Sequence, residues 1–274
     1  MTSVHFKPTT TRFDLTHALK MSELSLIAYK SQKEIRASVE KLGYSQFKFF
    51  DSSNTQAFMV GTDEVIILSF RGTESIQDWI TDLKIKFVQG PLGKVHKGFY
   101  AALMSIWKDV KEALLKFQRN SQSVWITGHS LGGALATLAV AALIEENCDV
   151  GGAYTFGQPR VGSEKFAKKL DSQYKYRFFR VVNNEDIVTR IPTRLMGYYH
   201  VGSDVYIDAL GMLHRGPKWW FRFLDAAASQ VVRSLDRFKA LREQFPNGLE
   251  DHDIEKYLRR IKENLTRESR GRTT

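Results

Sequence analysis

The chain has 274 residues, of which 43% are hydrophobic and 12% aromatic, so it is not a disordered chain and is long enough for a large core. Its formal net charge of +10 favours anionic partners, yet the sequence carries no nucleic-acid-binding signature, so we expect no nucleic-acid partner. The first expected element is a helix over residues 16–38. Short apolar runs between turn residues then predict antiparallel strands at 47–50, 57–60 and 65–70.

From residue 99 the pattern changes to helices alternating with strands. We expect helices at 99–117, 131–144 and 163–170, and strands at 124–127, 153–156, 177–182 and 200–207. This alternation predicts an α/β fold with a mostly parallel central sheet and helices on both faces. We expect one domain over residues 1–265 and a disordered tail at 266–274. Sites in such sheets lie at the carboxyl ends of the strands.

The location of the protein is predicted from what its sequence lacks. No apolar stretch is long enough to span a bilayer, and we recognise no secretory signal in the first residues. Cys148 is the only cysteine, so no internal disulfide can form. We therefore expect a cytoplasmic protein.

Residues 126–133 read ITGHSLGG and place Ser130 between Gly128 and Gly132. The expected strand ends directly before Ser130 and the expected helix begins directly after it. This context is typical of the Gly-x-Ser-x-Gly nucleophile elbow, in which a strained turn exposes the hydroxyl at the edge of the sheet. An incidental glycine-rich turn is the alternative interpretation.

A serine nucleophile needs a base and an acid that orients the base, and in this architecture they follow the serine in the order acid, then histidine. Asp186 is the preferred acid because it follows the expected strand 177–182 within a polar turn. Glu185 and Asp204 are its rivals.

Three histidines are candidates for the base. His252 is preferred because it opens an expected helix, where a loop can deliver the imidazole. His200 begins an expected strand and suits a structural role, and His214 lies in an aromatic-rich segment. Position alone leaves the three open.

Seven segments in order resemble the class 3 lipase family, which has the α/β-hydrolase fold. They span roughly residues 58–257 and read LSFRGTESIQDWITDL, VHKGF, ITGHSLGGALATL, TFGQPRVG, NEDIVTRIP, YHVGSDVY and DHDIEKYL. The resemblance implies that Ser130 is the nucleophile, Asp186 the acid and His252 the base, with no metal or organic cofactor.

The resemblance also implies an oxyanion hole and a lid. Leu131 and Thr73 would donate backbone N–H groups to the oxyanion. The lid, expected at about 73–85, is an amphipathic helix that opens at a lipid surface, with its apolar positions at Ile76, Trp79, Ile80 and Leu83. A helix packed permanently on the core is the alternative.

The chain departs from the family at a basic, aromatic-rich cap segment of about 212–246, which suits a lipid interface or a plain cap. We expect a serine ester hydrolase that cleaves acylglycerols and touches anionic membranes peripherally. A phospholipase A1 acting on anionic membranes is one alternative, and a catalytically silent membrane-binding scaffold is another.

Overall fold

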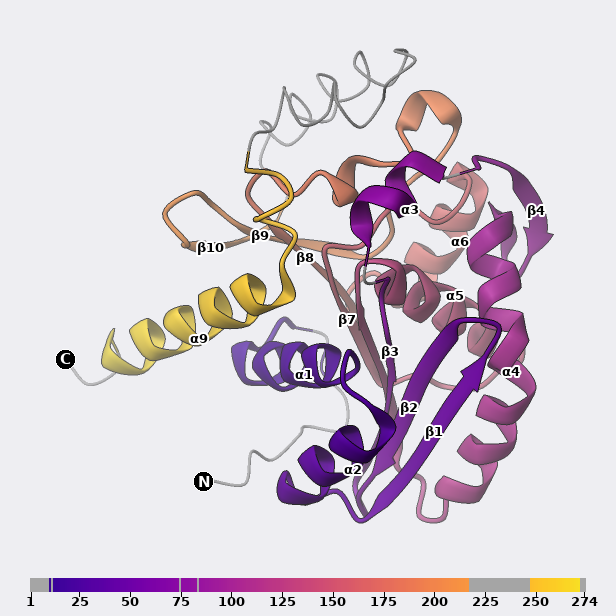
Figure 1. The fold of residues 1–274 in the computed structure, drawn as a ribbon, viewed down its shortest axis with the longest axis vertical. Coiled ribbons are helices and arrows are strands. Elements are labelled where there is room, and N and C mark those ends of the chain that lie inside the picture. The colour runs from indigo at the N-terminus through magenta and orange to yellow at the C-terminus, as the bar shows by residue number, and fades with distance from the viewer. Residues whose placement is uncertain (1–9, 11, 74, 83, 217–246, 272–274) are drawn as a thin grey trace.

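The structure, a computed structural model, describes residue 10 and residues 12–73, 75–82, 84–216 and 247–271. In this part of the chain a central sheet of eight strands has the order β1-β2-β3-β6-β7-β8-β9-β10 (Figure 1). The strands are β1 Gln46–Ser52, β2 Thr55–Gly61, β3 Val65–Phe70, β6 Ser123–His129, β7 Gly152–Phe156, β8 Phe178–Asn183, β9 Ser203–Ile207 and β10 Leu213–Arg215.

The sheet begins antiparallel and becomes parallel, as the sequence predicts. β1 pairs with β2 and β2 with β3 in antiparallel register, whereas β3, β6, β7, β8 and β9 are parallel neighbours. Phe70 lies opposite Gly128, and Phe156 lies between His129 and Val181. This register brings the carboxyl ends of four strands to one edge, where the loops carrying residues 71–73, 130, 157 and 184–186 begin.

Helices cover both faces of the sheet, which confirms the predicted layering. One apolar cluster joins the sheet to α4 (Lys97–Phe117), α5 (Leu131–Glu145) and α6 (Glu164–Tyr174). A second cluster joins the other face to α1 (Leu15–Ile27) and α9 (Ile254–Gly271), which lie side by side in Figure 1. The β-branched and aromatic strand residues are buried between these two helical layers.

The predicted helix over residues 16–38 is wrong, because two helices occupy that region. α1 ends at Ile27 and α2 spans Gln32–Lys41. Ser31 begins α2 with a capping box, in which its hydroxyl faces the Glu34 backbone N–H and the Glu34 carboxylate accepts from the Ser31 backbone N–H at 3.1 Å. The extended backbone that this cap requires at Ser31 cannot continue the preceding helix.

The remaining elements shape the edge where the loops meet. They are α3 (Ile76–Asp82), the paired strands β4 (Phe87–Gly90) and β5 (Gly93–His96), and the short 3₁₀ helices η1 (Val188–Arg190) and η2 (Arg194–Met196). The predicted strand 200–207 begins only at Ser203. α9 begins at Ile254, so His252 lies in the turn before that helix. The helix continues to Gly271, so the prediction of a disordered tail at 266–274 is wrong for residues 266–271.

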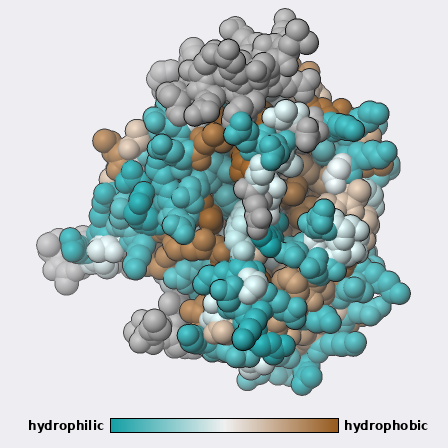
Figure 2. Space-filling view, viewed as in Figure 1, coloured by the Kyte–Doolittle hydropathy of each residue, from teal (hydrophilic) through white to brown (hydrophobic). Residues whose placement is uncertain are grey.

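The surface gives two further findings. No helix in the described ranges is long and apolar enough to cross a bilayer. The face seen in Figure 2 is mostly hydrophilic, with hydrophobic residues gathered in separate patches. Most of the expected cap segment, residues 217–246, lies outside the described residues.

Candidate active site

Ser130 stands at a sharp turn between β6 and α5. Its φ of 58° and ψ of −127° are unusual for a residue with a side chain, and its backbone N–H donates to the Phe156 carbonyl at 2.9 Å. The flanking glycines are required by space: a Cβ on Gly128 would lie 2.3 Å from the Gly132 carbonyl oxygen, and one on Gly132 would lie 2.3 Å from the Phe70 carbonyl oxygen. The strand and helix can therefore approach this closely only with glycine at both positions.

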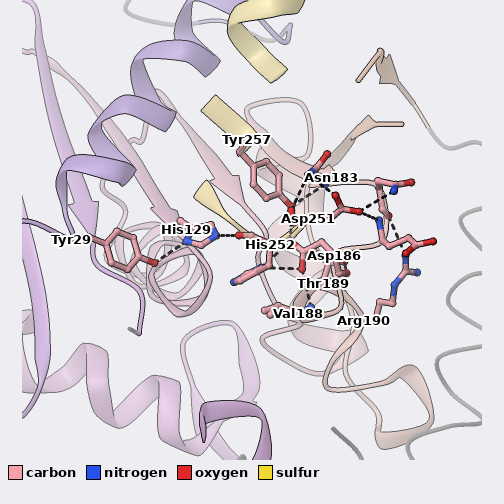
Figure 3. Close-up of polar contacts among 12 residues, drawn as sticks. Tyr29, His129, Asn183, Asp186, Val188, Thr189, Arg190, Asp251, His252 and Tyr257 are labelled. Atoms are coloured by element: carbon pink, nitrogen blue, oxygen red, sulfur yellow. Dashed lines mark hydrogen bonds and ion pairs between the residues drawn. The ribbon is translucent and has the colours of Figure 1, made fainter. Parts of the chain in front are cut away.

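Asp186 and His252 form a buried pair (Figure 3). The His252 ring lies beside that of His129, which precedes Ser130, with ring centroids 4.5 Å apart. The Nδ1 atom of His252 lies 2.9 Å from each carboxylate oxygen of Asp186, and both side chains are buried. Asp186 also accepts hydrogen bonds from the Tyr257 hydroxyl at 2.6 Å and the Val188 backbone N–H at 2.9 Å. Because an ionised carboxylate can only accept, Nδ1 of His252 carries the proton and Nε2 is the basic nitrogen.

The ionisation of Asp186 is set by these contacts. Burial acts to raise the pKa of Asp186, but the neighbouring His252 and the hydrogen bonds from His252 and Tyr257 hold that pKa below its ordinary value. Burial raises the pKa of Tyr257 far above its usual range, and the Asp186 carboxylate raises it further. Tyr257 is therefore a permanent donor to an ionised Asp186.

His129 connects the serine turn to the histidine turn. Its Nε2 atom lies 2.6 Å from the His252 carbonyl oxygen, so Nε2 carries a proton and Nδ1 accepts from the Tyr29 hydroxyl at 2.8 Å. Burial, and then the nearby His252, lower the pKa of His129 to about 3. His129, which directly precedes Ser130 in the chain, is therefore neutral and fixes the backbone of His252 through this hydrogen bond.

Asp251 fixes the other side of the histidine turn. Its buried carboxylate accepts from the Asn184 side chain at 2.9 Å and the Glu185 backbone N–H at 3.0 Å, and it pairs with Lys256 at 2.6 Å. These contacts join the turn that carries His252 to the loop that carries Asp186.

Two buried polar atoms in this site have no hydrogen-bond partner within the described part of the chain, Ser130 Oγ and His252 Nε2. A serine hydrolase requires a hydroxyl oxygen as nucleophile and a basic nitrogen beside it, and these two atoms are of those kinds. Gly157 leaves room for the pair: its φ is 59°, and a Cβ there would lie 2.8 Å from both Asp186 Oδ2 and His252 Nδ1.

The expected oxyanion residues meet at the same turn. Thr73 follows the end of β3 and Leu131 opens α5, and both line a groove of about 450 Å³. A Cβ on Gly72 would lie 3.2 Å from Ser130 Cβ, so the backbone before Thr73 is in contact with the serine. The N–H groups that open a helix have no carbonyl partner in a preceding turn, so the start of α5 favours negative charge.

The helix expected as a lid covers the loop of Asp186. Ile80 of α3 is 4% exposed and packs with Ile187, Val188 and Ile191, with Ile76 at the edge of the same cluster. Trp79 stacks on Phe99 of α4, with ring centroids 5.9 Å apart. Leu83 lies outside the described residues. Ser130 is fully buried in this arrangement.

The rival residues have other partners. Asp204 forms an ion pair with Arg180, and Glu185 accepts from the Asn247 backbone N–H at 3.4 Å. His200 contacts the Thr189 carbonyl through Nε2 at 2.8 Å, and His214 pairs with Asp208 at 2.6 Å. Each is therefore engaged in a contact of its own.

Sequence reasoning missed four residues of this site: Tyr29, His129, Asp251 and Tyr257. The only local signals are adjacency to Ser130 for His129, adjacency to His252 for Asp251, and a position one turn further along α9 for Tyr257. No group of three His, Cys, Asp or Glu residues in the described ranges could hold a metal ion.

Comparisons with known proteins identify the family that the chain resembles. The model of the family "Lipase (class 3)" matches residues 67–196. A lipase from Rhizomucor miehei is 37% identical over 156 residues, which cover 53% of this chain and 42% of that protein. The secreted mono- and diacylglycerol lipase LIP4 from Malassezia restricta is 32% identical over 162 residues, which cover 54% of each protein. The chain thus spans about half the length of the curated relatives it matches.

The relatives overturn the expectation of a cytoplasmic location. Several of them, from Malassezia, Fusarium and Penicillium, are named as secreted lipases. The expectation rested on the composition of the first residues and on a single cysteine, and neither property determines where a protein works.

Solved structures show the same architecture. The crystal structure of a lipase from Rhizopus microsporus var. chinensis matches with a TM-score of 0.58 and 30% identity, over 70% of this chain and 74% of that one. The mostly parallel sheet with a serine elbow after β6 is the α/β-hydrolase fold. The chain belongs to the class 3 lipase family.

Proposed function

We propose that the protein is a serine carboxylic-ester hydrolase that cleaves acylglycerol esters. The observation that carries this proposal is the strained, buried Ser130 turn beside the buried Asp186–His252 pair, in which Nε2 of His252 has no hydrogen-bond partner within the described residues. The match to the class 3 lipase family supports the same reaction.

The reaction has two steps in this site. His252 Nε2 takes the proton of Ser130 while Oγ attacks the ester carbonyl carbon, and the oxyanion is stabilised by the backbone N–H groups of Thr73 and Leu131. His252 then gives the proton to the departing alcohol oxygen, which leaves an acyl-serine ester. Water repeats the sequence, with His252 as base, and releases the acid and free Ser130.

Asp186 keeps its charge throughout. It holds His252 in the tautomer with a proton on Nδ1 and stabilises the imidazolium that forms during both steps. No metal or organic cofactor takes part in this proposal. The continuous sheet also supports our proposal that residues 1–265 form one hydrolase domain. The net charge of +10 supports a further proposal, peripheral contact with anionic lipid surfaces.

The test uses wild type and Ser130→Ala on p-nitrophenyl butyrate and on a tributyrin emulsion. We expect the variant to lose at least about a thousandfold in rate while keeping its fold, because losing a triad member removes most of the catalysis. Ser172→Ala, at an exposed position on α6, is the matched control and should retain the wild-type rate. Equal rates in Ser130→Ala and wild type would contradict the proposal.

Two alternatives give other outcomes. A membrane-binding scaffold would bind lipid vesicles without cleaving either ester. A phospholipase A1 would prefer phospholipid vesicles, and a rice protein named phospholipase A1-II 1 is 28% identical over 204 residues, 60% of this chain and 51% of that protein.

A further inference from the structure

A groove leads away from the oxyanion side of Ser130, between the β1–β2 turn and the start of α5. Its volume is about 450 Å³, and the residues that line it include Asn54, Gln56, Arg71, Thr73, Ser75 and Leu131. It is thus directly continuous with the two residues expected to hold the ester carbonyl oxygen.

Hydrogen-bonding side chains dominate this groove. Asn54 is exposed at the β1–β2 turn, with a φ of 63°, and Ser75 is exposed before α3. Arg71 lies over the Tyr29 ring, with its guanidinium carbon 5.9 Å from the centroid, and donates to Gln56 Oε1 at 2.5 Å. Gln56 in turn donates to Asp51 at 2.9 Å, so the guanidinium is fixed by the sheet rather than free to move.

The opposite chemistry is found under α3. There the buried residues are aliphatic, and they pack around the loop that carries Asp186. A nucleophile between an aliphatic cluster and a polar groove suits an ester with one apolar and one polar part. A second acyl chain in the groove would desolvate its amide and guanidinium groups without replacing their hydrogen bonds, which is unfavourable.

We propose that this groove is a subsite for the polar alcohol part of the substrate. The ligand class is the head of a polar glycerolipid, whose hydroxyl or phosphodiester oxygens hydrogen-bond to Asn54 and Arg71. The acyl chain of the same ester lies on the aliphatic side under α3. This assignment rests on the proposed ester hydrolysis and specifies which glycerolipids are favoured.

The test compares three lipids with the same acyl chain in one detergent: monooctanoylglycerol, dioctanoyl phosphatidylglycerol and trioctanoylglycerol. The quantity measured is the ratio of kcat/KM for each polar lipid to that for trioctanoylglycerol, because a general loss of catalysis cancels in this ratio. Wild type should favour at least one of the polar lipids.

Two variants remove single groove contacts. Arg71→Gln should lower the phosphatidylglycerol ratio about tenfold, the loss expected for one charge-assisted hydrogen bond. Asn54→Gly should lower at least one polar-lipid ratio roughly fivefold, as for a neutral hydrogen bond. Glycine avoids adding backbone strain there, since it tolerates a positive φ. Arg119→Gln, at an exposed turn before β6, is the control and should change no ratio.

The kcat/KM ratio that falls in the groove variants identifies which head group the groove binds. A fall confined to monooctanoylglycerol identifies hydroxyl oxygens as the ligand, and a fall in phosphatidylglycerol identifies the phosphodiester. Ratios that stay at wild-type values in both groove variants, or that fall equally in Arg119→Gln, would overturn the subsite. If wild type cleaves trioctanoylglycerol through Ser130 in that case, the proposed function stands while the subsite fails.

Discussion

The hydroxyl of Tyr257 offers a direct test of how the buried Asp186 is held. Tyr257 is fully buried on α9, and its hydroxyl donates to Asp186 at 2.6 Å while accepting from the Asn183 backbone N–H at 2.9 Å. Tyr257→Phe removes one oxygen atom and keeps the ring that packs near His129 and Phe156. The change therefore isolates two hydrogen bonds.

The stability that Tyr257→Phe loses depends on the charge of Asp186, which accepts one of the two hydrogen bonds. A hydrogen bond to a buried charged group contributes about 1.5–3 kcal/mol, and an unsatisfied buried N–H costs roughly 1–3 kcal/mol. Because partial relaxation reduces the sum, we expect the free energy of unfolding to fall by about 2–4 kcal/mol, which a typical domain of about 5–15 kcal/mol survives. We also expect kcat to fall about tenfold, which corresponds to about 1.4 kcal/mol in the transition state.

The pH dependence gives the sharper measurement. The folded-state pKa of Asp186 lies below its ordinary value, so this group adds stability above pH about 3.9, and that stability is lost as pH falls through the folded pKa. Removing a donor to the carboxylate raises the folded pKa. Urea unfolding of Tyr257→Phe should therefore show a smaller acid-induced loss of stability, which is complete at a higher pH than in wild type.

Tyr154→Phe is the matched control. Tyr154 is also fully buried and accepts from a backbone N–H, that of Asp14 at 3.1 Å, but no carboxylate accepts from it in the described contacts. Tyr154→Phe should lower the free energy of unfolding without changing how that free energy depends on pH in acid. The reasoning would be refuted if both variants lost the same stability at every pH and retained the same kcat.

Three further predictions concern the surroundings of the site. Gly157→Ala should abolish most activity, because its Cβ would lie 2.8 Å from atoms of Asp186 and His252. Gly197→Ala is the control, with a φ of 82° and the nearest atom to its Cβ at 3.6 Å, and it should keep the wild-type rate. Both variants are measured by ester hydrolysis and thermal unfolding. His252→Ala should cost several orders of magnitude in kcat, while His200→Ala should mainly lower the melting temperature, and reversed effects would contradict the assignment of the base. Trp79→Ala should raise kcat/KM on a soluble ester up to about tenfold, because the Trp79–Phe99 pair contributes about 0.5–1.5 kcal/mol to the arrangement in which α3 covers Ser130. An unchanged rate would contradict a lid that moves.

The sequence predicted those parts of the site that depend on local order. Ser130 is marked by its glycines together with the strand and helix around it, and Asp186 by its place directly after β8. The assignment of His252 depended on the family resemblance, because position alone could not separate it from His200 and His214. The apolar periodicity alone gave a wrong prediction of one helix over 16–38. Ser31 and Glu34 form a capping pattern inside that range, and this pattern marks the start of a second helix.

Contacts between distant residues could not be predicted in the same way. The hydrogen bond between Tyr29 and His129 joins residues 100 positions apart, and the one between Tyr257 and Asp186 joins residues 71 apart. Tyrosine or histidine on a helix or strand is equally consistent with ordinary packing. Only the parallel register of the strands and the pairing of α1 with α9 bring these side chains together.

The covered arrangement of Ser130 has an energetic consequence. α3 has only seven residues, too few to be stable alone, so its position depends on the packing of Ile80 and Trp79. Exposing the buried Ile80 to water costs about 1.5–3 kcal/mol, and exposing the rest of the half-buried Trp79 adds to that cost. A lipid surface gives the side chains of Ile80 and Trp79 an apolar environment, so it offsets this cost. We therefore expect access to Ser130 to be set by the medium around α3, while the Asp186–His252 pair, held by strand ends and buried hydrogen bonds, keeps one geometry in both states.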